Sequence, residues 1–290
     1  MTASHPYSGT LAEALDRAGN LLCVGIDPVL ERLPSELAAG EPGEALERFG
    51  LGVVEAVTGL VGVVKPQSAC FERFGSAGYR AMERVIGAAR AAGLVVILDA
   101  KRGDIGSTAA HYAAGAAGLG AQAITVNAYM GRSAVEPFLD AGLGVHVLVR
   151  TSNPDSDEIQ LERLESGGTL GQRMARLVHD LGGVSGSALG RVGAVVGATK
   201  DAAELAALRV LMPEAPVLVP GYGAQGGDLG AIAALRREGA RSPGTAGVIV
   251  NASRSVLYPR AGVRDEPGSW IRGVAARARA HADAIGVLRG

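Results

Sequence analysis

Residues 94–119 read LVVILDAKRGDIGSTAAHYAAGAAGL, and they contain the clearest repeating unit of the chain. It opens with an apolar run, Leu94–Asp99, that is interrupted only at its end. An almost continuous apolar run of this length is typical of a strand buried on both faces of a parallel sheet. A short polar turn follows, in which Gly103 permits a sharp change of direction. The alanine-rich segment Ser107–Leu119 then predicts a helix, so the stretch is one strand-then-helix unit.

Seven more units of the same kind are spread along the chain. The eight predicted strands are Leu21–Asp27, Val61–Lys65, Leu94–Asp99, Ala123–Asn127, Val145–Arg150, Ala194–Ala198, Val217–Pro220 and Val248–Asn251. The helices predicted to follow them are Glu44–Val57, Tyr79–Ala92, Ser107–Leu119, Ala134–Ala141, Leu170–Leu181, Ala202–Leu211, Asp228–Glu238 and Gly268–Leu288. Eight successive units without a break in composition predict a (β/α)8 TIM barrel, as a single domain over residues 1–290. An extra helix, Thr10–Ala18, precedes the first strand.

A doubly wound sheet is the alternative architecture. Such sheets usually have fewer strands, and no Gly-x-Gly-x-x-Gly turn follows the first predicted strand here. The longest connection between predicted strands begins with Thr-Ser-Asn-Pro-Asp-Ser-Asp at residue 151. We expect a long loop at about 151–169, lying over the face that carries the site.

The composition limits the classes of function. Of the 290 residues 48% are apolar and 20% are charged, and acids and bases are interleaved to a net charge of −1. There is no polybasic arm, no signal-like N-terminus and no apolar run of the roughly 18 residues that span a membrane. Cys23 and Cys70 fit neither a disulfide framework nor a zinc spacing. We therefore expect a cytoplasmic protein that binds neither nucleic acid nor membrane.

The basic residues are almost all arginine. Of the 28 lysines and arginines, only Lys65, Lys101 and Lys200 are lysines. A lysine can give up a proton in a suitable site and an arginine in practice cannot, so a retained lysine is a candidate for proton transfer. For Lys200 we prefer chance retention.

The richest strand end in the sequence is DAKRGD at 99–104. The working residues of a barrel lie where strands end and the following loops begin. Asp99 and Lys101 are two residues apart, so on an extended backbone both side chains point the same way. Lys65 ends the preceding strand, and Asp104 follows the turn. A solvated ion pair is the plainer interpretation of one Asp-x-Lys spacing, but two lysines and two aspartates at adjacent strand ends predict an alternating charge network inside a cleft.

The loops after the last two strands predict a phosphate site. Residues 220–227 read PGYGAQGG ahead of a predicted helix, and Asn251–Arg254 adds a guanidinium. These loops are the usual phosphate site of the fold, because backbone N–H groups and helix N-termini favour anions. The histidines at positions 5, 111, 146, 179 and 281 have no metal-ligand spacing, so we expect no metal.

In these motifs the sequence resembles the orotidine 5′-phosphate decarboxylase family. ILDAKRGDI at 97–105 is similar to the family signature, and VGIDP at 24–28, VKPQ at 64–67 and VPGYGAQ at 219–225 are similar to its other strand ends, in the same order. The resemblance covers roughly Leu21–Pro259. RTSNP at 150–154, with the long loop behind it, resembles the longer bacterial branch of the family, type 2.

The resemblance implies decarboxylation of orotidine 5′-monophosphate to uridine 5′-monophosphate, in de novo pyrimidine biosynthesis, without a cofactor. It implies that Lys101 protonates C6, that Asp99 lies beside the departing carboxylate and that Lys65 supports the network. It also implies a homodimer in which Asp104 enters the neighbouring subunit's site. The implied substrate contacts are Asp27 with the ribose hydroxyls, Thr108 near the ribose or the partner's site, Ser152 with the pyrimidine edge, and Gln225 and Arg254 with the phosphate.

Three other functions remain open on the residues alone. A magnesium-dependent sugar-phosphate decarboxylase or aldolase of the same barrel superfamily would share the Asp-x-Lys-x-x-Asp spacing, but it needs a further acid at a strand end, where this chain has Lys65. An aldolase that forms a Schiff base on Lys101 is the second possibility. A catalytically inactive barrel that only binds ligands is the third, and the intact charge set argues against it.

Overall fold

The computed structural model describes residues 6–182, 189–198, 200–222, 227–259 and 268–288. Eight parallel strands close into a barrel in chain order: β1 (Leu22–Ile26), β2 (Val63–Pro66), β3 (Val95–Arg102), β4 (Ala123–Val126), β5 (Gly144–Arg150), β6 (Val192–Val196), β7 (Val217–Val219) and β8 (Val248–Ala252). The last strand pairs with the first, with Cys23 of β1 opposite Asn251 of β8. The predicted (β/α)8 barrel is confirmed, and the doubly wound alternative is wrong.

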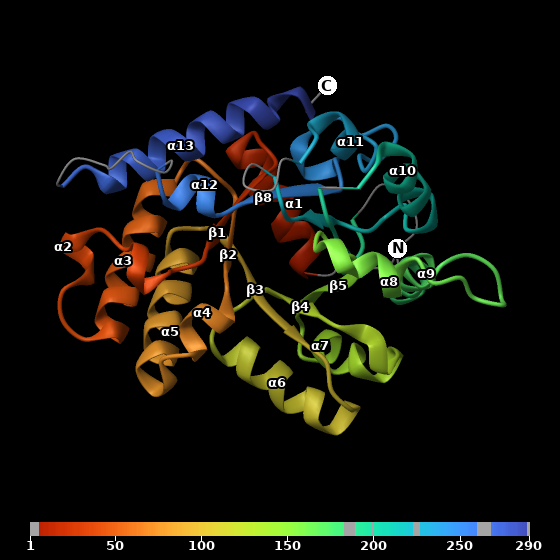
Figure 1. Ribbon diagram of the computed structural model, residues 1–290, viewed down its shortest axis with the longest axis horizontal. Helices are drawn as coiled ribbons and strands as arrows, with labels where there is room; N and C mark the ends of the chain where they lie inside the picture. The colour runs from red at the N-terminus through yellow and green to blue at the C-terminus, as the bar shows by residue number, and fades with distance from the viewer. Residues whose placement is uncertain (1–5, 183–188, 199, 223–226, 260–267, 289–290) are drawn as a thin grey trace.

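Helices surround the barrel (Figure 1). The helix α1 (Pro6–Ala18) precedes the first strand, and the outer helices that follow the eight strands in turn are α3 (Pro42–Val57), α5 (Gly75–Ala91), α6 (Gly106–Gly118), α7 (Glu136–Asp140), α9 (Leu170–Gly182), α10 (Ala202–Leu211), α11 (Leu229–Ala233) and α13 (Trp270–Ile285). Short helices fill the connections: η1 (Leu30–Arg32), α2 (Ser35–Ala38), α4 (Ser68–Glu72), η2 (Ala128–Met130), η3 (Arg132–Ala134), η4 (Pro154–Ser156), α8 (Asp157–Gln160), η5 (Pro243–Thr245), α12 (Arg254–Leu257) and η6 (Gly286–Leu288). Within the described ranges, no helix has the length and apolar character needed to span a bilayer.

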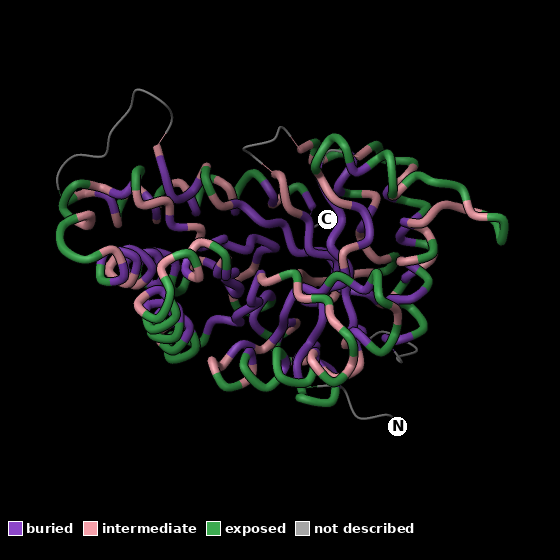
Figure 2. Tube along the Cα trace, turned by 60° about the horizontal axis from the view of Figure 1, so that its bottom comes forward, coloured by how far each residue is buried: buried purple, intermediate pink, exposed green. Residues whose placement is uncertain are grey.

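The strands are buried on both faces, as Figure 2 shows by the continuous buried trace through the middle of the molecule. Alternate residues of β1, such as Val24 and Ile26, belong to the core between the strands and the outer helices. Cys23, Val63 and Ile97 belong to a second core inside the barrel. Because side chains alternate between the two faces of a strand, the inward set continues to the strand ends and delivers the next inward residues to one face of the barrel.

Helix α1 closes the opposite, amino-terminal end of the barrel. Its Tyr7, Leu11 and Leu15 are buried in the inner core. Gly144, at the start of β5, makes this docking possible, because a Cβ there would lie 2.0 Å from Cδ1 of Tyr7. The Tyr7 hydroxyl reaches Nε2 of His146 at 2.6 Å, so this nitrogen of the buried imidazole has a partner within the core.

Helix α11 ends earlier than the predicted Asp228–Glu238. After Ala233 the chain leaves the helix, and the carbonyl of Leu235 accepts a hydrogen bond from Nε of Arg209 at 2.6 Å. The backbone N–H of Arg237 donates to the carbonyl of Ala246 at 2.9 Å. These bonds to distant segments replace helical bonds, so tertiary contacts override the local helical preference.

Stability between pH 7 and pH 5 should depend on His146. Burial lowers its pKa to about 4, from an ordinary 6.5. Folding thus favours the neutral imidazole, a contribution that is complete above pH 6.5 and is lost as the pH falls toward 4. From pH 7 to pH 5 the wild type should lose about 2 kcal/mol more free energy of unfolding than a Tyr7→Phe/His146→Leu double variant in urea denaturation. Equal losses in the two proteins would contradict this assignment.

Candidate active site

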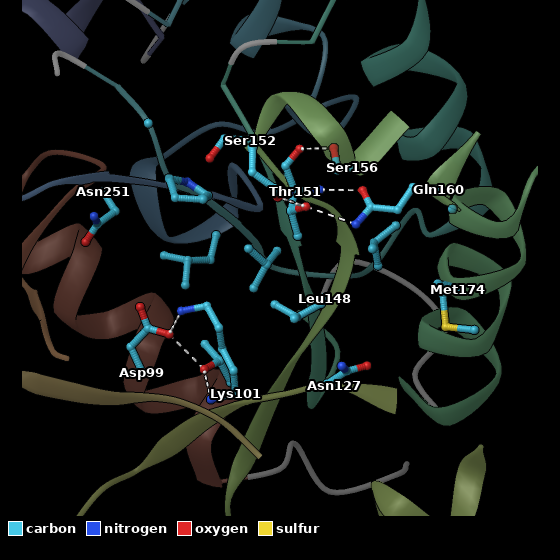
Figure 3. A pocket seen from close by; sticks show the side chains of 18 of the residues that line it. Asp99, Lys101, Asn127, Leu148, Thr151, Ser152, Ser156, Gln160, Met174 and Asn251 are labelled. Carbon is cyan, nitrogen blue, oxygen red and sulfur yellow. Dashed lines mark hydrogen bonds and ion pairs between the residues drawn. The ribbon is translucent and has the colours of Figure 1, made fainter. Parts of the chain in front are cut away.

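The carboxyl ends of the strands surround a cleft of about 940 Å³. Most of its polar lining comes from successive strand ends: Asp27, Lys65, Gln67, Asp99, Lys101, Thr125, Asn127, Ser152, Asn251, Ser253 and Arg254. Figure 3 shows Asp99 and Lys101 on one side of this space and Gln160 and Met174 on the other. A concave site of this volume, with apolar walls and a few convergent polar groups, is suited to a small organic ligand.

The carboxylate of Asp99 is the centre of the polar contacts. Its Oδ2 accepts hydrogen bonds from Nζ of Lys65 at 2.7 Å and from Nε2 of Gln67 at 3.1 Å. Its Oδ1 accepts hydrogen bonds from Nζ of Lys101 at 2.5 Å and from Oγ1 of Thr125 at 2.9 Å. Four donors on two oxygens fix the orientation of the carboxylate.

Electrostatics keeps Lys65 and Asp99 charged although both are buried. Burial alone would lower the pKa of Lys65, but attraction to Asp99 and Asp27 outweighs it and raises that pKa well above its ordinary value. Burial alone would raise the pKa of Asp99, but Lys65 and Lys101 together hold it well below its usual range. The side chains of Lys65 and Asp99 are 4% and 9% exposed, whereas that of Lys101 is 46% exposed and faces the cleft. The cluster therefore presents one accessible ammonium to a ligand.

Asp27 and Asn251 offer buried acceptors at the neighbouring strand ends. Within the described part of the chain, Oδ1 of each accepts no hydrogen bond. Both residues line the cleft. Gly25 keeps this corner open, because a Cβ there would lie 1.9 Å from Oγ of Ser253. Unpaired buried acceptors beside an open cleft are suited to the hydroxyl groups of a ligand.

Arg254, one of the two predicted phosphate ligands, lies just after β8. Arg254 is exposed and lines the cleft together with Gly221 and Tyr222. Ser152, after β5, also lines the cleft. Gln225, the other predicted phosphate ligand, lies outside the described residues.

Asp104 and Thr108 do not line the cleft of their own chain. Oδ1 of Asp104 accepts a hydrogen bond from the backbone N–H of Ile105 at 2.8 Å, just before helix α6. Both side chains are only partly exposed, beside the exposed Ile105. The structure thus brings Lys65, Asp99 and Lys101 together. Asp104, the fourth member of the predicted charge network, lies apart from them.

Two contacts of Asp99 were not singled out from the sequence. Gln67 stands two residues after Lys65, and Thr125 stands two residues before Asn127. Both therefore share the inward face of their strands. Counting one alternate position beyond Lys65 finds Gln67, and counting one back from Asn127 finds Thr125. A threonine inside an apolar run, however, does not stand out as a polar site residue.

The segment after β5, predicted as a long loop, contains η4 and α8. The side chain of Arg150 binds this segment to the rest of the barrel. Nη2 of Arg150 lies 2.7 Å from Oδ1 of Asp157, and Nη1 donates to Oγ of Ser156 at 3.0 Å. Nε lies 2.5 Å from Oε1 of Glu204 in α10. The Arg150 side chain is only 2% exposed. This buried guanidinium joins the loop to an outer helix, as its planar fork of donors allows.

Lys200 binds the same segment, through the carboxylate of Asp157. Its Nζ lies 3.0 Å from Oδ1 of Asp157, and its side chain is 9% exposed. Chance retention is therefore the poorer interpretation of this lysine, since the structure gives it a defined ion pair.

Among the described residues, no three His, Cys, Asp or Glu side chains form a cluster able to hold a metal ion.

Comparisons with known proteins point to one family. A model of the orotidine 5′-phosphate decarboxylase / HUMPS family matches residues 20–260. Orotidine 5′-phosphate decarboxylase of Rhodopirellula baltica is 40% identical over 273 residues, which cover 87% of this chain and 88% of that protein. The enzyme of that name from Aromatoleum aromaticum is 45% identical over 259 residues, covering 87% and 90%. The solved structure of Leishmania donovani OMP decarboxylase matches with a TM-score of 0.78 at 32% identity, covering 99% of both chains.

Replacing Arg150 should loosen the segment 151–169. Arg150→Lys keeps the charge but loses the fork that binds three partners at once. Loss of one or two hydrogen bonds should raise the rate of cleavage by a glutamate-specific protease within this segment by roughly tenfold, as located by mass spectrometry. Arg163→Lys, an exposed residue of the same segment, is the control and should leave the rate unchanged. Equal rates in the two variants would show that Arg150 does not hold the segment.

Proposed function

Because this chain belongs to the orotidine 5′-phosphate decarboxylase / HUMPS family, we propose that it removes CO2 from orotidine 5′-monophosphate and releases uridine 5′-monophosphate. One observation carries the proposal: a buried carboxylate, Asp99, holds two lysines at the ends of β2 and β3, and one of them faces the cleft. The sugar-phosphate alternative needs a further acid where β2 ends, and the ammonium of Lys65 at that position would instead repel a divalent cation.

The chemistry needs fixed charge rather than an electron sink. When the bond between C6 and the carboxylate carbon breaks, the electron pair stays on C6 and CO2 leaves. The pyrimidine ring does not delocalise this charge, so preorganised positive charge must stabilise it. The Nζ ammonium of Lys101 supplies that charge and then donates a proton to C6, and water returns a proton to the lysine. Asp99 beside the substrate carboxylate would repel it, and release of neutral CO2 would relieve that repulsion.

The rest of the cleft is assigned to the remainder of the nucleotide. Asp27, with its unpaired Oδ1, would accept hydrogen bonds from the ribose hydroxyls. Ser152 would bind the pyrimidine edge, and Arg254 would bind the phosphate together with Gln225. Binding energy from the remote phosphate would then offset the cost of placing the substrate carboxylate near Asp99.

The proposal includes a homodimer in which Asp104, with Thr108 nearby, acts toward the partner's cleft. Asp104 lies outside the cleft lining of its own chain and directly precedes Ile105, an exposed apolar residue. Ile105 is 56% exposed, and Tyr129 and Met130 are 78% and 50% exposed. Large apolar side chains exposed at the ends of neighbouring strands, as these are after β3 and β4, are a feature that an interface would cover.

The proposal also places the chain in the cytoplasm, acting on a small nucleotide and not on nucleic acid. Cys23 and Cys70 are free thiols, as a reducing compartment allows. The net charge of −1 provides no excess of positive charge for a nucleic-acid backbone.

Lys101→Arg should abolish turnover while the nucleotide still binds. Arginine keeps the charge but does not release a proton at neutral pH. The kcat, followed by loss of orotidine 5′-monophosphate absorbance, should fall by about 10³-fold or more. Lys200→Arg is the matched control and should keep the wild-type kcat, because a guanidinium can still pair with Asp157. Turnover of the wild type should also survive dialysis against EDTA. A Lys101→Arg variant with near wild-type kcat would refute the role of proton donor.

Arg254→Ala should affect the nucleotide far more than the nucleoside. Only the nucleotide has phosphate-binding energy to lose, so kcat/KM should fall by roughly 100-fold for orotidine 5′-monophosphate and little for orotidine. Arg279→Ala, at an exposed position of α13, is the control. A similar loss for both substrates would remove Arg254 from the phosphate site.

Mixing two inactive variants should restore activity if sites are shared between subunits. In a heterodimer of Lys101→Ala with Asp104→Asn, one site carries both defects and the other carries none. Random exchange at equal amounts makes about half of the dimers heterodimers, so roughly a quarter of wild-type activity should return. An inactive mixture, with subunit exchange verified by native mass spectrometry, would mean that each chain builds its own site.

A further inference from the structure

Strand β3 loses register with β4 at the residues that carry the chemistry. Leu98 lies opposite Ile124, but the next pair is Arg102 opposite Val126. Three residues of β3, 99–101, therefore face a single residue of β4, Thr125. Such a bulge interrupts the regular ladder and changes the direction of side chains, which is common beside active sites.

The backbone at Lys101 is strained by this bulge. Its φ is 46°, and among the described residues it is the one non-glycine position with a positive φ. A residue with a side chain adopts this left-handed conformation only where the surrounding structure holds it there. Something must therefore fix the peptide of Lys101.

Thr125 makes that contact and a second one. Its Oγ1 accepts a hydrogen bond from the backbone N–H of Lys101 at 2.9 Å. The same hydroxyl donates to Oδ1 of Asp99 at 2.9 Å. Thr125 is 1% exposed, in the middle of β4, so neither bond competes with bulk water. One buried hydroxyl thus contacts the backbone of the bulge and the carboxylate that binds Nζ of Lys101.

We propose that Thr125 is a positioning residue that holds the β3 bulge and so aims the ammonium of Lys101 into the cleft. The inference rests on the proposed decarboxylase function. A hydroxyl is required because it accepts one bond and donates the other at the same time, which neither an apolar nor a purely donating group does. Without it the strained peptide of Lys101 loses its hydrogen bond and can relax away from φ 46°.

The role predicts an effect on kcat and not on binding. Asp99 keeps its charge without Thr125, because Lys65 and Gln67 still bind its Oδ2. The groups assigned to the ribose and the phosphate lie on other strands, so the affinity for the nucleotide should not change. Only the alignment of the Lys101 ammonium with C6 should become less accurate, which lowers kcat.

The test compares Thr125→Val, which keeps the shape and removes the hydroxyl, with Thr125→Ser, which keeps the hydroxyl. For Thr125→Val we expect kcat to fall by roughly 10- to 100-fold, with KM and the Kd of uridine 5′-monophosphate changed by less than about threefold. Thr125→Ser should retain kcat within a few-fold of the wild type. Thr58→Val, at the exposed end of α3, is the control for a threonine hydroxyl remote from the cleft.

Each outcome decides the point. A wild-type kcat in Thr125→Val overturns the inference, and so does a parallel loss of nucleotide affinity, which would indicate direct contact with substrate. If Thr125→Val does not fold, Thr125→Ala against Thr125→Ser gives the same comparison, and equal kcat values in that pair overturn the inference. If the wild-type protein itself does not decarboxylate orotidine 5′-monophosphate, the proposed function fails, and that result is distinct from an active wild type with an unaffected Thr125→Val.

Discussion

The rest of the site depends on a single buried negative charge. Asp99 lies in the second half of β3 with almost no exposure, and an unpaired carboxylate there would be very costly. Lys65 and Lys101 satisfy it, and the three groups together carry one excess positive charge. That excess remains at Nζ of Lys101, facing the cleft. A ligand that gains negative charge at this point is stabilised by groups already in place, without reorganisation during the reaction.

The barrel provides this arrangement because the two ends of its interior differ in polarity. At the amino-terminal end, α1 and the inward residues of the strands form an apolar core, and even His146 is held neutral there by burial. Two residues further along β2, β3 and β8 than Val63, Ile97 and Ile249, the inward positions become Lys65, Asp99 and Asn251. The apolar end provides the stability, which allows the other end to hold charges that favour chemistry over stability.

Much of this could be predicted from the sequence, because it depends on local patterns. Apolar runs located all eight strands, and the scarcity of lysine directed attention to Lys65 and Lys101. The bulge opposite Thr125 could not be predicted, because it depends on the register between two strands and not on either strand alone. The early end of α11 and the contacts of Arg150 depend on bonds between segments far apart in the chain. Local propensity contains no information on such bonds.

The central claim is that Lys101, held by Asp99, stabilises and protonates negative charge at C6. The most direct measurement is the loss of deuterium from C6 of 6-deuterated uridine 5′-monophosphate in ordinary water, followed by NMR, because this exchange forms the carbanion with no CO2 involved. The wild type should catalyse the exchange, and Lys101→Ala should bind the nucleotide without catalysing it. Exchange at the wild-type rate in Lys101→Ala would contradict the account.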